Sequence, residues 1–133
     1  MATVNERIED AGRALATLKE IAAVSRPNAI ERDAAIARFT YSFEAVWKAA
    51  RAYLLDREGQ DAASPKSAVR ASHGVGLLDD AGSEAALAMA NDRNMIVHLY
   101  REDLAKQVFA RLAGHAETLD AWLTAMRARM TET

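Results

Sequence analysis

Residues 29–57 read AIERDAAIARFTYSFEAVWKAARAYLLDR and carry the longest helical pattern in the chain. Steps of three and four residues place one apolar stripe on a single helix face. The stripe consists of Ile36, Phe39, Phe43, Val46, Ala50 and Tyr53, and it is widened by Tyr41, Trp47 and Leu54. Gly59 is suited to end the helix. At about 1.5 Å per residue the helix would be roughly 43 Å long, a length that needs neighbours of similar size.

Four more helices are predicted on either side of this one. The first carries Val4, Ile8, Ala11, Leu15, Leu18 and Ala22 and ends near Pro27, and a short third begins at Ser64-Pro65 and ends at Gly74 or Gly76. The fourth begins near Ser83 and reaches Asn94. The fifth starts with the acids Glu102 and Asp103 and runs to about Arg129, with Gly114 suggesting a close helix approach or a mild bend. Three long and two short helices predict an all-α, antiparallel bundle of the four-helix type.

The composition agrees with such a bundle. The chain has 133 residues, a length typical of one domain spanning 1–133, and 30 of them are alanine, which favours close helix packing. Val and Ile number only 12, too few for a β-sandwich or barrel. The absence of cysteine excludes a disulfide scaffold, a thiolate metal site and a cysteine nucleophile.

Charge and hydropathy limit the partners and the compartment. No run approaches the roughly 20 apolar residues that cross a bilayer, and the beginning MATVNERIEDAGR is charged where a signal peptide is apolar, so we expect a soluble cytoplasmic protein without a membrane partner. The 17 basic and 19 acidic residues give a net charge of −2, so any RNA contact should be local. Three scattered histidines predict no metal site.

The segment at residues 92–100, DRNMIVHLY, places charged and polar groups beside an apolar run. Burying Arg93 unpaired would be costly, so it must be paired, solvated in a cleft or turned toward another chain. In a continuous helix Asn94 and His98 share a face, whereas Arg93 and His98 point about 140° apart. Arg93 and His98 therefore meet on one ligand only if the helix breaks between them or a second copy faces the first.

These residues resemble the signature of the HEPN superfamily, in which arginine, four residues, histidine, one residue and tyrosine follow one another, here Arg93, His98 and Tyr100, with Asn94 after the arginine. The wider pattern resembles the branch called nucleotidyltransferase substrate-binding proteins over roughly residues 4–128. It comprises RFTYSFEAVWK at 38–48, Ser64-Pro65, GLLD at 76–79 and DRN at 92–94.

The resemblance implies a HEPN-like homodimer whose two Arg/His motifs face each other across the two-fold axis. It also implies a toxin–antitoxin pair, in which this chain cleaves RNA and a cognate minimal nucleotidyltransferase neutralises it by adding AMP to Tyr100. The same branch has also been described as the non-catalytic substrate-binding subunit of a two-component nucleotidyltransferase. Both alternatives stay open, as does a purely structural bundle.

A metal-independent and cofactor-independent ribonuclease needs a base, an acid and a cation for the phosphate. His98 suits the proton transfers, Arg93 suits the phosphate, and Asn94 could orient either of them. We take these three as candidate catalytic residues, and Arg93, Asn94 and Lys48 as candidates for binding RNA or a nucleotide.

Other charged residues have plainer interpretations. Glu44 and Lys48 are four apart and should pair on the helix surface, although in a dimer Glu44 could reach Arg93. His73 and His115 are expected to be structural or solvent-facing, because no carboxylate or histidine sits at metal-ligand spacing from either of them. A local basic patch around the motif is conceivable, or else ordinary solvated charges, and its members would be Lys66, Arg70, Arg101, Lys106 and Arg111.

Overall fold

A computed structural model describes residues 2–132, and within this range all regular secondary structure is helical. The helices are α1 (Val4–Ala22), α2 (Ala29–Glu58), α3 (Pro65–Gly74), α4 (Asp80–Asn94), the single 3₁₀ turn η1 (Ile96–His98) and α5 (Glu102–Thr131). The predicted all-α fold with three long helices and two shorter ones is confirmed. Among the described residues, no helix is both long and apolar enough to cross a membrane.

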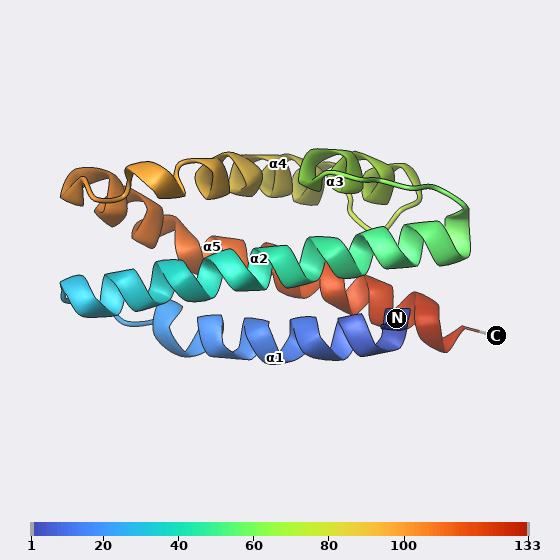
Figure 1. Cartoon of the computed structure of the whole chain (residues 1–133), viewed down its shortest axis with the longest axis horizontal. Coiled ribbons are helices and arrows are strands. Elements are labelled where there is room, and N and C mark those ends of the chain that lie inside the picture. The colour runs from blue at the N-terminus through green and yellow to red at the C-terminus, as the bar shows by residue number, and fades with distance from the viewer. Residues whose placement is uncertain (1, 133) are drawn as a thin grey trace.

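The long helices α1, α2 and α5 pack together, and α3 and α4 cover the side of α2 and α5 that faces away from α1 (Figure 1). Helix α1 runs antiparallel to α2, and α4 runs antiparallel to α5, whereas α2 and α5 run in the same direction, so the chain turns back at each end of the bundle (Figure 1). The α4–η1–α5 connection, which carries the Arg/His segment, lies at one of these ends. This is the antiparallel bundle that the helical periodicity predicted.

Side-chain caps fix where the helices begin. Asn28 and Glu31 form a reciprocal capping box at the start of α2, and Ser64 and Ser67 form another at α3, where Pro65 takes the first helical position. Helix α4 begins at Asp80, three residues before the predicted Ser83, because the Asp79 carboxylate accepts a hydrogen bond from the Gly82 N–H at 2.7 Å. Asp79, the first of two adjacent acids in the sequence, is thus the N-cap of α4.

The predicted apolar stripes form the core. Phe39, Phe43 and Val46 of α2 are fully buried, and Trp47 is almost so, so this stripe is core. Fully buried Trp122 of α5 places its indole N–H on the Ser72 hydroxyl of α3 at 3.0 Å, which satisfies both polar groups. Tyr41 departs from the prediction, since it is 44% exposed and shares a hydrogen bond with the Thr17 hydroxyl of α1.

Gly114 has a different environment from the one expected. A methyl group placed on its Cα would meet nothing within 4 Å, so no close helix approach explains this glycine. Gly59, also in open space, has φ of 67° and ends α2 in the left-handed conformation. The close helix approach expected at Gly114 is absent, whereas Gly59 ends α2 as predicted, because its left-handed conformation needs the backbone freedom of glycine.

These two glycines give a matched test of backbone propensity. Gly114→Ala should raise the free energy of unfolding by about 0.5–1 kcal/mol, because alanine is the better helix former in an exposed helix interior. Gly59→Ala should lower it, because an L side chain is strained at positive φ. Urea unfolding followed by circular dichroism measures both, and a shift of the same sign in the two variants contradicts the assignment.

Candidate functional site

The Arg/His segment lies where α4 stops. Helix α4 ends at Asn94, Met95 turns the chain, and η1 follows with the His98 N–H bonded to the Met95 carbonyl at 2.9 Å. Arg93 therefore belongs to the last turn of an α-helix, whereas His98 belongs to a separate 3₁₀ turn. A helix break, one of the two conditions under which Arg93 and His98 could meet on one ligand, is thus present. The shared face of Asn94 and His98 in a continuous helix does not apply.

Arg93 is held by α2 of the same chain. Its guanidinium lies 2.6 Å from Glu44 Oε1, and no second protomer is needed for this contact. Glu44 Oε1 is buried and accepts no well-aligned hydrogen bond, so its contact with Arg93 is one of charge. The other oxygen, Oε2, accepts from the Trp47 indole N–H at 3.1 Å and lies 3.8 Å from Lys48 Nζ. The expected Glu44–Lys48 pair forms, but Arg93 is the closer cation.

Arg93 and Asn94 share a small pocket of about 190 Å³ between α2, the start of α3 and the end of α4. Arg93 donates a long hydrogen bond to the Asn94 side-chain oxygen, at 3.4 Å. Lys66 lines the same pocket and donates to the Asn91 side chain at 2.8 Å. Two cations and an amide therefore surround a space that could accept a small anionic group such as a phosphate.

His98 and Tyr100 face outward. Both are exposed, Tyr100 to 83%, and neighbouring Val97 is 75% exposed. Within residues 2–132 neither the His98 ring nor the Tyr100 hydroxyl makes a hydrogen bond or an ion pair. Both groups are therefore accessible to a ligand or to another chain.

Asp92, directly before Arg93, is buried in the opposite direction. Its carboxylate accepts two hydrogen bonds from Arg111 of α5, both at 2.8 Å, and lies 2.7 Å from His115 Nε2. His115 is itself buried and stacks on the Phe39 ring, with centroids 5.3 Å apart. Burial opposes ionisation of Asp92, but the bonds from Arg111 and His115 outweigh it and hold the pKa of the Asp92 carboxyl below its ordinary value.

The Asp92 network shows that His115 is structural, as expected, and removes Arg111 from the expected basic patch. His115 does have a carboxylate partner, and it was missed because Asp92 is 23 residues away in the chain; His73 has one as well, Asp80, at 2.7 Å. Arg111 does not join a basic patch, because its guanidinium donates two hydrogen bonds to the Asp92 carboxylate. This carboxylate raises the pKa of the Arg111 guanidinium. The one available signal was the spacing of Arg111 and His115, four residues apart on one helix face.

Of the other members of the expected basic patch, Arg101 and Lys106 are neutralised, whereas Lys66 and Arg70 form no ion pair within residues 2–132. Arg101 pairs with Asp103 at 3.1 Å and Lys106 with Glu102 at 3.2 Å, and both are exposed surface pairs. Lys66 is the member of the patch that lines the pocket of Arg93 and Asn94.

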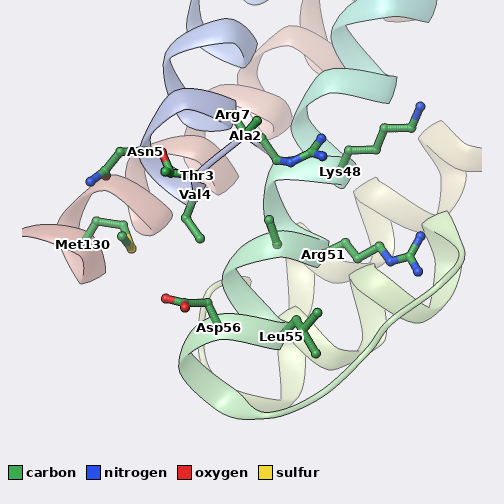
Figure 2. Close-up of a pocket in the computed structure, with 11 residues that line it drawn as sticks. Ala2, Thr3, Val4, Asn5, Arg7, Lys48, Arg51, Leu55, Asp56 and Met130 are labelled. Atoms are coloured by element: carbon green, nitrogen blue, oxygen red, sulfur yellow. The ribbon is translucent and has the colours of Figure 1, made fainter.

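Lys48 lies on the wall of a second, larger hollow, which we call the basic groove (Figure 2). This groove of about 750 Å³ lies between the beginning of α1 and the second half of α2 and is lined by the cations Arg7, Lys48 and Arg51, the acid Asp56, and apolar side chains that include Val4, Leu55 and Met130. Lys48 thus stands between the groove and Glu44, next to the Arg93 pocket but not in it.

The described residues contain no group of three His, Asp or Glu side chains placed to hold a metal ion. The arrangement thus offers proton transfer by His98 and anion binding by Arg93, Asn94 and Lys66.

Known proteins resemble this chain in sequence and in fold. Residues 6–128 match the family described as nucleotidyltransferase substrate binding protein like. The chain belongs to this family. A crystal structure of a protein from Thermus thermophilus is similar to this family member, with 49% sequence identity, a TM-score of 0.86, and coverage of 88% of this chain and 98% of that one.

A second solved structure shares the fold at much lower sequence identity. It is a crystal structure of a mutant of the toxin–antitoxin pair MntA-HpeT, which is 15% identical over 94% of this chain and 97% of that one, with a TM-score of 0.74. The HEPN-like helical fold is therefore confirmed. The comparison with curated proteins gives no match.

Replacing Asp92 tests whether its network fixes the end of α4. Asp92→Asn should lower the free energy of unfolding at neutral pH by about 2 kcal/mol, because charged hydrogen bonds to Arg111 and His115 are lost. The Asp92 pKa is lower in the folded chain, so this stabilisation is present above the ordinary value of 3.8 and is lost as pH falls through the folded pKa. The difference in free energy of unfolding between Asp92→Asn and the wild type should thus become smaller at acidic pH, as measured by urea unfolding.

Asp120→Asn is the matched control, because Asp120 also pairs with a cation, Lys19 at 2.7 Å, but on the surface. Its cost should stay below about 1 kcal/mol. Equal losses in the two variants would show that burial of Asp92 adds nothing.

Proposed function

We propose that the chain, as one HEPN-type domain, acts in the cytoplasm as the ribonuclease toxin of a toxin–antitoxin pair. It works as a homodimer without metal or other cofactor, and a cognate minimal nucleotidyltransferase neutralises it. The single observation that carries the proposal is the position of the motif at the helix break. There Arg93 and Asn94 line a pocket while His98 and Tyr100 are exposed and unengaged within residues 2–132. Family membership and the shared fold of the MntA-HpeT structure support it.

The chemistry follows from the groups at the break. In RNA cleavage the ribose 2′-oxygen attacks the adjacent phosphorus, losing its proton to a base, while the 5′-oxygen leaves and takes a proton from an acid. In a two-fold dimer the His98 of one copy acts as the base and that of the other as the acid. Arg93 stabilises the additional negative charge on the phosphate oxygens, and Asn94, which contacts Arg93, keeps it oriented.

Neutralisation by AMP addition has a suitable acceptor in Tyr100. Its hydroxyl is two residues from His98 on a side chain that is 83% exposed. An adenylate there would add bulk and negative charge beside the histidine, which would obstruct an RNA strand and repel its phosphates.

The alternative is a non-catalytic subunit that presents substrate to the nucleotidyltransferase, and the contact between Arg93 and Glu44 bears on both functions. Arg93 is engaged by Glu44 at 2.6 Å, so a phosphate must compete with a carboxylate for it. Under this alternative Arg93, Asn94 and Lys48 bind a nucleotide or RNA without cleaving it.

Purified protein incubated with RNA in the presence of EDTA should cleave it. Arg93→Ala and His98→Ala should each lower the rate at least a hundredfold, because each removes a group that acts in the transition state. His73→Ala removes an exposed histidine paired with Asp80 and should leave the rate unchanged. If expression of the wild type does not arrest growth and purified protein leaves RNA intact while binding it, the non-catalytic alternative holds.

Modification is tested by co-expression with the cognate minimal nucleotidyltransferase and measurement of the intact mass. We expect an increase matching one or more AMP groups, absent from Tyr100→Phe and retained in Tyr41→Phe, the other exposed tyrosine. An unmodified chain, or modification that survives Tyr100→Phe, contradicts this assignment.

A further inference from the structure

The basic groove is a second surface that the Arg/His motif does not use. It gathers three cations, Arg7 from α1 and Lys48 and Arg51 from α2, against one carboxylate, Asp56, in a chain whose net charge is −2. Figure 2 shows the charged ends of the three cations on one side of the groove and Asp56 on the other. A local excess of positive charge on an acidic chain indicates an anionic ligand.

The cations differ in how far the protein itself neutralises them. Arg7 forms no ion pair within residues 2–132. Lys48 lies 3.8 Å from Glu44, which is closer to Arg93 at 2.6 Å, so Lys48 has only a share of one carboxylate. Arg51 alone has a full partner, Asp61, at 2.9 Å. Asp56 is in turn bonded to Arg57 at 3.0 Å, which weakens its repulsion of an anion. Arg7 and Lys48 are therefore the groups available for a ligand.

The groove is continuous with the motif along one face of α2. Glu44, Lys48, Arg51 and Leu55 follow at steps of four, three and four residues and so share a face that extends about 16 Å along the helix. One end of this face holds Arg93 and the other lines the groove. A chain-like anion bound at Arg93 can thus continue along α2 to Lys48 and Arg7.

We propose that the basic groove binds the sugar–phosphate backbone of single-stranded RNA on one flank of the bond that is cleaved at Arg93 and His98. The lining contains no aromatic side chain among the described residues, so bases find no stacking platform there and contact falls on phosphates and sugars. Binding in the groove is consequently independent of base sequence. The inference rests on RNA being the substrate under the proposed function.

The test measures binding rather than cleavage, in the His98→Ala background, by fluorescence anisotropy of a labelled single-stranded RNA of mixed sequence. Adding Arg7→Gln and Lys48→Gln should weaken binding about tenfold. It should also make the dependence of log K on log salt shallower by about 1.4, the value for two lost contacts to single-strand phosphates. Arg13→Gln with Lys19→Gln removes the same charges from the part of α1 outside the groove and should change neither quantity by more than a small fraction.

The outcomes separate this inference from the function on which it rests. The groove pair is the variant with Arg7→Gln and Lys48→Gln, and the control pair is the one with Arg13→Gln and Lys19→Gln. If the wild type cleaves RNA but the groove pair binds RNA as tightly as the control pair, RNA binding in the groove is overturned while the proposed ribonuclease activity is supported. If the groove pair loses the nucleotidyltransferase in co-purification while RNA affinity is unchanged, the groove is a protein interface and the inference is again overturned. If the wild type neither cleaves nor binds RNA, both fail together.

Discussion

The buried carboxylate of Asp92 is the interaction on which the candidate site depends. A carboxylate that is only 6% exposed is tolerated only when its oxygens are paired, and here Arg111 and His115 of α5 pair both of them. His115 in turn stacks on Phe39 of α2, so the contacts that begin at Asp92 connect α4, α5 and α2. The end of α4 is therefore fixed relative to the core, and this also fixes where the residues after α4 begin.

Two consecutive residues at the end of α4 contact different helices. Asp92 points to α5 and Arg93 to Glu44 of α2, so the last turn of α4 is fixed from two sides. Beyond it the helix stops, and His98 and Tyr100 lie on a short exposed connection. A cation held in place next to groups free to meet another molecule suits an anion site, in which an anion would share Arg93 with Glu44.

The distribution of charge explains how an acidic chain can still contact a polyanion. Most surface cations pair locally, as Lys106 does with Glu102, and contribute little beyond solubility. Arg7 and Lys48, two cations that are incompletely neutralised, line the groove beside the face of α2 that leads to Arg93. Net charge excludes an extended basic surface, but it does not exclude a short track of cations along one helix.

The sequence by itself determined the helices and the motif. Periodicity, caps and terminators act over three or four residues, so the bundle, and Arg93, Asn94, His98 and Tyr100 as its candidate site, could be read from spacing and resemblance. Only the tertiary structure decided what surrounds that site. Glu44 meets Arg93 across 49 residues of chain and Asp92 meets His115 across 23, because such contacts depend on how helices pack and in which register, which no local pattern encodes.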